Sequence, residues 1–217
     1  MLFESRDDAG KKLAKKLIKF KDQNLIVLSL PRGGVPIGFQ IAKKLHAPLD
    51  VLVVRKLGAP SNPEYGIGAI AEGVRILDEA AIANLKLSQD DIRSIESQER
   101  IELNRRTREY RGTDAPINIK GKTVILVDDG LATGVTARAA TKAILEQNPQ
   151  KLIIAMPVCA LDSVEGICSL LRPKKDEIIC LSTPSDFSAV GLWYKTFDQI
   201  SDQEVVDLLK KSKRLTT

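Results

Sequence analysis

The sequence predicts an α/β protein with three α/β/α layers around a central, mostly parallel sheet. Short β-branched runs alternate with amphipathic helical patterns, as in parallel α/β folds. Of the 217 residues 43% are apolar, and a net charge of +5 is too small for a disordered chain. No run approaches the ~18 consecutive apolar residues of a membrane span, and the charged first residues are unlike a secretory signal. We therefore expect a cytoplasmic protein with no membrane partner.

The elements follow one another in βαβ order. Buried strands are predicted over residues 25–30, 50–55, 124–127, 152–158 and 177–181. Amphipathic helices are predicted over 8–20, 34–45, 135–147 and from Ser201 onward. The segment 57–68 is rich in glycine, proline, serine and asparagine. It is expected to be a loop, either a lid that closes over a ligand or an ordinary surface loop.

We expect a single domain over residues 1–217, with a helical insertion at 78–120 and a C-terminal lobe at 182–217. The pattern from Asp78 to Arg111 is helical throughout, and Ser88 with Asp91 resembles a capping box. Glutamate–arginine pairs four residues apart recur in it. Its arginines are therefore predicted to form a solvated, ion-paired face.

The cysteines and the histidine argue against a metal site. Cys159, Cys168 and Cys180 are too far apart for a C-x-x-C pair, and are expected to be reduced, partly buried thiols. A single histidine, His46, makes a histidine-based metal site or a Ser-His-Asp triad improbable. The positive net charge favours anionic partners, but the evenly mixed charges argue against nucleic acid.

One segment carries the predicted chemistry: Val124-Ile-Leu-Val-Asp128-Asp129-Gly130-Leu131-Ala132-Thr133-Gly134-Val135-Thr136. Its two carboxylates follow a buried strand, and open α/β sheets bind ligands at that end. The turn lets backbone N–H groups approach an anion at the positive end of the next helix, and Thr133 and Thr136 add hydroxyl donors. Asp128 and Asp129 can accept hydrogen bonds from vicinal ribose hydroxyls. The alternatives are a magnesium-binding acidic pair or a strand end with solvated aspartates.

This segment resembles the signature of the type I phosphoribosyltransferases. The resemblance implies their fold and the substrate 5-phosphoribosyl-1-pyrophosphate (PRPP), bound as its Mg²⁺ complex. It implies transfer of ribose 5-phosphate to a nitrogenous base with release of pyrophosphate, and a homodimer. Magnesium would be held mainly by PRPP, with no direct protein ligand and with Asp128 and Asp129 reached through water.

Two further motifs support the resemblance. Pro31-Arg32-Gly33-Gly34 follows the first strand, where the family keeps its pyrophosphate loop, and by analogy the Pro31–Arg32 peptide bond is expected to be cis. Arg55-Lys56 matches a basic pair near the pyrophosphate of adenine- and orotate-type enzymes, and Glu64-Tyr65-Gly66 is similar to part of the mobile loop of the adenine type. The resemblance thus assigns catalysis to Arg32, Lys56, Asp128 and Asp129. It assigns PRPP binding to these four residues and to Gly33, Gly34, Ala132, Thr133, Gly134, Val135 and Thr136.

The acceptor base is left open. Enzymes acting on 6-oxopurines carry an aspartate where this chain has Ala132, which counts against that mechanism and leaves adenine-like, orotate-like or other acceptors. Phe187, Trp193 and Tyr194 are candidates for stacking a flat base. The alternative is that Trp193 and Phe197 simply pack the C-terminal lobe. The alternative function is a PRPP-binding regulator without turnover.

Overall fold

The core of the protein is a five-stranded sheet whose strands all run parallel, in the order β2-β1-β6-β7-β8. The computed structural model describes residues 2–113 and 115–215, without the side chain of Glu64. The five strands are β1 (Leu25–Ser29), β2 (Leu49–Val51), β6 (Thr123–Val127), β7 (Lys151–Val158) and β8 (Glu177–Ser182). Every residue of β1 and β6 is buried, as expected for central strands covered on both faces.

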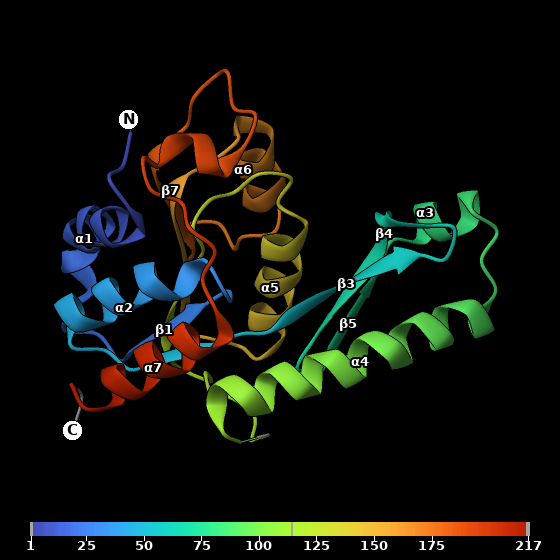
Figure 1. Cartoon of the computed structure of the whole chain (residues 1–217), viewed down its shortest axis with the longest axis horizontal. Helices are drawn as coiled ribbons and strands as arrows, with labels where there is room; N and C mark the ends of the chain where they lie inside the picture. Colours follow the sequence, from blue (N-terminus) through green and yellow to red (C-terminus); the bar gives the residue numbers. More distant parts are fainter. Residues whose placement is uncertain (1, 114, 216–217) are drawn as a thin grey trace.

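Helices cover both faces of this sheet and complete three layers (Figure 1). On one face lie α1 (Arg6–Leu17), followed by η1 (Ile18–Phe20), then α2 (Gly34–Leu45) and α7 (Asp202–Lys213). On the other face lie α5 (Val135–Glu146) and α6 (Leu161–Cys168). Ile125 and Val127 of β6 pack against the helices of the first face, and Val124 and Leu126 pack against the helices of the other face. The predicted α/β/α architecture is confirmed.

A second, antiparallel sheet projects from the core as an arm (Figure 1). It consists of β3 (Val54–Ala59), β4 (Asn62–Ala71) and β5 (Val74–Leu77). The expectation of a loop over 57–68 was therefore wrong, and the strand expected over 50–55 is divided between β2 and β3. The glycines that indicated a loop permit close strand approach instead: a Cβ on Gly58 would lie 2.3 Å from the carbonyl oxygen of Pro63.

The arm is completed by α3 (Glu79–Asn84) and the long α4 (Gln89–Arg111), which runs back along the strands (Figure 1). The helix expected throughout 78–111 is thus interrupted between α3 and α4. The capping box of Ser88 and Asp91 is present, and α4 carries the expected intrahelical ion pairs. Two more ion pairs fasten α4 to the strands, Arg55–Glu99 and Arg75–Glu96.

The cysteine prediction was wrong for two of the three residues. Cys159 follows β7, Cys180 lies in the neighbouring strand β8, and they form a disulfide with a Cα–Cα distance of 6.3 Å. They are 21 positions apart in the sequence, so local spacing rules do not detect a pair that parallel strands bring together. Cys168 is a free, exposed thiol. Within residues 2–113 and 115–215, no helix is long and apolar enough to span a bilayer.

Candidate functional site

The predicted site lies between β1 and β6, where the order of the strands in the sheet reverses. The chain leaves β1 towards β2 on one side, and leaves β6 towards β7 on the other. Ligands of open α/β sheets bind outside the carboxyl ends of the strands at such a switch point. The loop after β1 is Pro31–Gly34, and the loop after β6 is Asp128–Gly134. The Pro31–Arg32 peptide bond is cis, as expected.

The two loops are in direct contact because the first carries two glycines. A Cβ added to Gly33 would lie 1.9 Å from Oδ2 of Asp129, and one added to Gly34 would lie 2.6 Å from the carbonyl oxygen of Val127. A side chain at Gly33 would displace the carboxylate of Asp129, and one at Gly34 would clash with the backbone of Val127 and Asp128. The structure thus brings together four residues that the sequence predicts for one site: Gly33, Gly34, Asp128 and Asp129.

The two carboxylates of the acidic pair are largely enclosed by protein. Oδ1 of Asp128 accepts the backbone N–H of Asp129 at 2.8 Å. Burial raises the pKa of Asp128, and the neighbouring charge of Asp129 raises it further. Burial also raises the pKa of Asp129, and the guanidinium of Arg6 opposes that rise. Two like charges in an enclosed position indicate a site that favours positive charge on a ligand.

The loop after Asp129 leads into the N-terminus of α5. Gly134 has φ 72°, a left-handed conformation that favours glycine, and precedes the first residue of the helix. The carbonyl oxygen of Ala132 accepts a hydrogen bond from the hydroxyl of Ser163, which fixes the turn. Thr133 and Thr136 are exposed, so their hydroxyl groups and the N–H groups of the first turn face solvent, where an anion can bind.

The two predicted cationic residues lie farther apart. Nη1 of Arg32 is 3.8 Å from Oδ1 of Asp202, the first residue of α7. Lys56 lies in β3, with its side chain beside Gly66 of β4. It lines a cavity of about 390 Å³ between β3 and α4, next to the ion pair of Arg55 with Glu99. Arg32 thus belongs to the loop at the switch point, whereas Lys56 belongs to the arm.

The predicted stacking aromatics are mostly packed into the C-terminal lobe. Tyr194 is 5% exposed, with ring centroids 5.4 Å from Phe3 and 5.0 Å from Phe197. Its hydroxyl donates to the backbone carbonyl of Asp129 at 2.6 Å. Tyr194 is therefore packed between protein side chains, which leaves its ring no face for a base. Phe187 and Trp193 are half-buried against the same cluster.

One residue of the site has no sequence signal. Nε and Nη2 of Arg6 both donate to Oδ2 of Asp129, at 3.0 and 2.8 Å. The two residues are 123 positions apart, and Arg6 lies in no recognisable motif. The prediction treated the acidic pair as open to ligand, whereas a guanidinium of the protein already occupies one of its oxygens.

Comparison with known proteins agrees with this geometry. Residues 4–194 match the family described as phosphoribosyl transferase domain. The chain belongs to this family. "Putative phosphoribosyl transferase Rv0571c" of Mycobacterium tuberculosis (strain H37Rv) is 42% identical over 214 residues, 98% of this chain and 47% of the relative. The chain thus spans about half the length of that curated phosphoribosyl transferase.

The chain is also similar to a more distant curated protein and to a protein of solved structure. "Bifunctional protein pyrR" of Enterococcus faecalis (strain V583) is 27% identical over 143 residues, 64% of this chain and 73% of that protein. The crystal structure of TT1426 from Thermus thermophilus is 35% identical, with a TM-score of 0.83 over 97% of this chain and 99% of that one. The predicted resemblance and the type I fold are thereby confirmed.

Proposed function

We propose that this chain is a phosphoribosyltransferase that transfers ribose 5-phosphate from PRPP to a nitrogenous base and releases pyrophosphate. The observation that carries the proposal is the contact between the two loops at the switch point. A glycine loop for a diphosphate touches an acidic pair for a ribose, and the second loop leads into the N-terminus of a helix for the 5-phosphate. The diphosphate, the ribose and the 5-phosphate of PRPP would thus each contact a complementary surface, and the three surfaces adjoin one another.

The protein's contribution in this proposal is to place charge. The bond from ribose C1 to the diphosphate breaks and its electron pair leaves with pyrophosphate, a bond from C1 to the acceptor nitrogen forms, and the proton of that nitrogen passes to the released pyrophosphate or to solvent. Positive charge develops on the ribose ring, as in other glycosyl transfers, and the carboxylates of Asp128 and Asp129 stabilise it. The backbone N–H groups of Gly33 and Gly34 bind the leaving diphosphate together with Arg32. Lys56, a mobile point charge on β3, joins them once the diphosphate is bound.

The 5-phosphate is assigned to the loop after β6. Its ligands would be the backbone N–H groups of the segment 132–136 and the hydroxyls of Thr133 and Thr136. Because a helix N-terminus carries partial positive charge and unpaired N–H groups, α5 attracts the anion without any basic side chain. Val135, which begins α5 and is 40% exposed, leaves this backbone accessible.

The residues present fit Mg²⁺ that arrives with the substrate. Among the described residues, no cluster of three or more acidic, histidine or cysteine side chains gathers to hold a metal. Asp128 and Asp129 supply carboxylate oxygens, the ligand type that Mg²⁺ prefers, and would contact the ion through its retained waters. When bound, the ion neutralises charge on the diphosphate leaving group.

The acceptor is a nitrogenous base whose identity we leave unassigned. Phe187 and Trp193 are the aromatic side chains that we propose for its pocket, and Tyr194 is left out because both sides of its ring are packed. The indole N–H of Trp193 is buried and has no hydrogen-bond partner among the described residues. Because this N–H is enclosed by protein, we assign only the half-buried ring of Trp193, and not its N–H, to the acceptor pocket.

A PRPP-binding regulator without turnover is the second candidate, since the proposed PRPP contacts do not require an acceptor. Isothermal titration with Mg-PRPP, followed by an assay of pyrophosphate release with a panel of nucleobases, separates the two. Binding with release identifies the enzyme, and binding without release for every base identifies the regulator. Absence of PRPP binding contradicts both. Sedimentation velocity on the same samples tests the homodimer that the family resemblance implies.

A further inference from the structure

Residues 3–6 pair with residues 193–198 next to Asp129. The backbone N–H of Phe3 donates to the carbonyl of Trp193 at 2.8 Å, and the N–H of Lys195 donates back to Phe3 at 2.8 Å. We call residues 3–6 and 193–198 together the terminal clasp. It contacts Asp129 twice, at the backbone carbonyl through Tyr194 and at the side chain through Arg6. The position of Asp129 is therefore set by two segments that lie far apart in the sequence.

Arg6 is held in place by further contacts within the terminal clasp. Its Nη1 donates to the carbonyl oxygen of Asp198 at 2.7 Å, and its Cζ lies 3.8 Å from the ring centre of Phe197. Its side chain is 10% exposed, and that of Asp129 is 17% exposed. A guanidinium with a carboxylate, a carbonyl and an aromatic face as neighbours has little freedom to leave.

Each carboxylate of the pair has one oxygen committed within the protein and one remaining. Asp128 uses Oδ1 for the N–H of Asp129, and Asp129 uses Oδ2 for both Arg6 nitrogens. Arg6 makes both of its bonds to Oδ2 of Asp129, so the guanidinium leaves Oδ1 of that carboxylate unused. The bond at Asp128 likewise involves Oδ1 and not Oδ2. Arg6 thus engages the acidic pair at a single oxygen.

We propose that Arg6 is a positioning residue for ribose binding: it holds one oxygen of Asp129 and so presents the other to a ribose hydroxyl. The inference rests on the proposed function, because it needs a ribose at the acidic pair. Among the described residues, the side-chain groups that face Asp129 are Arg6, the carboxylate of Asp128 and the hydroxyl of Tyr194. Arg6 is the cation among them and balances the charge that burial makes unfavourable.

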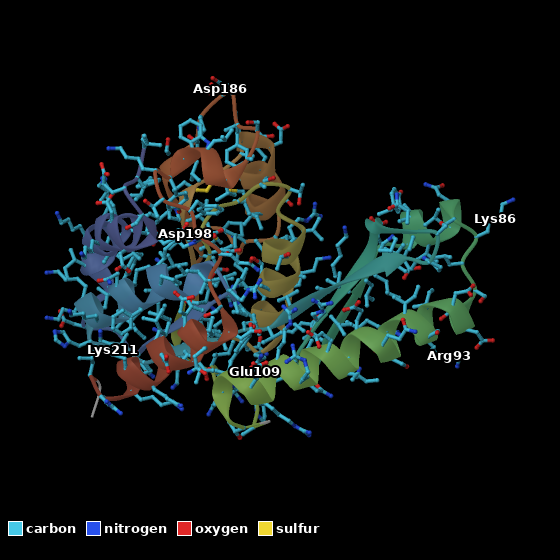
Figure 2. The ribbon with its side chains drawn as sticks, viewed as in Figure 1. Lys86, Arg93, Glu109, Asp186, Asp198 and Lys211 are labelled. Atoms are coloured by element: carbon cyan, nitrogen blue, oxygen red, sulfur yellow. A yellow bond between two sulfur atoms is a disulfide. The ribbon has the colours of Figure 1, made fainter. Side chains whose placement is uncertain are left out.

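The test compares the full-length protein with Arg6→Gln, Arg6→Lys and the control Arg93→Gln. Arg93 is an exposed arginine paired with Asp90, and Figure 2 shows it at the far end of the arm, distant from Asp198 of the clasp. Calorimetry measures the affinity of each protein for Mg-PRPP and for ribose 5-phosphate, and circular dichroism measures folding. We expect Arg6→Gln to weaken both ligands at least tenfold, Arg6→Lys to recover part of the loss, and Arg93→Gln to bind like wild type.

The other outcomes distinguish a failure of this inference from a failure of the proposed function. Unchanged binding of both ligands by Arg6→Gln shows that Arg6 has no role in binding, and tighter binding shows that it obstructs the site. Either result overturns this inference but leaves the proposed function standing. A loss confined to PRPP shows that Arg6 contacts the diphosphate, and also overturns it. If Arg6→Gln does not fold, Phe197→Leu loosens the guanidinium while keeping its charge; several-fold weaker binding of both ligands supports positioning, and unchanged binding refutes it. If the wild type binds neither ligand, the proposed function itself fails.

Discussion

Replacing Gly33 by alanine tests the contact between the two loops with a single methyl group. Gly33 has φ −61° and ψ −31°, so alanine adopts its backbone conformation without strain. The added Cβ would lie 1.9 Å from Oδ2 and 2.6 Å from Cγ of Asp129. The perturbation therefore acts on the acidic pair and not on the backbone.

The size of the effect follows from these distances. Ordinary contact begins at 3.4 Å, so the carboxylate of Asp129 must retreat by about 1.5 Å, the difference between 3.4 and 1.9 Å. A misplacement of about 1 Å can reduce a catalytic rate about 100-fold, and we take the same factor for the affinity of a site that holds its ligand through positioned hydrogen bonds. We expect Gly33→Ala to weaken PRPP binding by about that factor, roughly 2.8 kcal/mol. Overpacking should lower the free energy of unfolding by about 1–2 kcal/mol.

Calorimetry with Mg-PRPP and urea denaturation measure the two quantities. Gly166→Ala is the matched control, because it lies in α6 and its Cβ would find only Nη1 of Arg138, at 3.7 Å. That control should bind PRPP normally and gain about 0.5–1 kcal/mol of stability from the added helix propensity. Wild-type PRPP affinity in Gly33→Ala would show that the two loops do not form one site.

Three further predictions concern stability and the thiols. A raised pKa means that folded Asp128 holds its proton more tightly than the unfolded chain does, so its charge destabilises the fold above that pKa. Asp128→Asn should therefore raise the free energy of unfolding at pH 7 by about 0.5–2 kcal/mol, with less gain at pH 4, while PRPP binding weakens. Urea denaturation at both pH values measures this, and a stability loss at pH 7 contradicts it. For Asp176, burial opposes ionisation, but hydrogen bonds from Arg172 and from the N–H of Leu152 lower the pKa. Asp176→Ala should cost about 2–4 kcal/mol at pH 7, and the difference should shrink as pH falls through the lowered pKa; a constant difference across pH refutes the charge argument. Thiol titration of the unfolded protein should find one group, Cys168, before reduction and three afterwards, whereas three before reduction would exclude the disulfide.

The core and the two loops of the site could be predicted because their signals are local. The apolar run before Asp128 is a strand buried on both faces, and the small residues from Gly130 to Gly134 lead into α5 as the motif indicates. Pro31–Gly34 follows β1 in the same way. In each case a few consecutive residues contain both the strand and the turn that follows it, so no long-range information is needed.

The arm was mispredicted because glycine and proline occur both in loops and in strands that approach each other closely. In the segment 57–68 they suggested a loop, but Gly58 and Gly66 face one another in β3 and β4. A Cβ on Gly68 would lie 2.3 Å from the carbonyl oxygen of Ile76 in β5. These glycines allow strands to approach closely, and composition alone does not distinguish that role from a turn.

The terminal clasp could not be predicted because its contacts are long-range. Arg6 reaches Asp129 across 123 positions, and Tyr194 was assigned to a ligand by its aromatic type. In the structure its ring lies between Phe3 and Phe197, and its hydroxyl fixes the backbone of Asp129. Residue type singled out Tyr194 and gave no sign of Arg6, and only the fold shows that both contact Asp129.

The most direct measurement is calorimetric titration of Mg-PRPP into the wild-type protein and into the double variant Asp128→Asn, Asp129→Asn. Both substitutions keep the shape of the side chain, remove its charge and replace one acceptor oxygen by an NH2 donor, so a folded double variant tests the acidic pair. We predict saturable binding by the wild type and no detectable binding by the double variant. Equal affinity in the two proteins would contradict the assignment of the ribose to the crossing from β6 into α5.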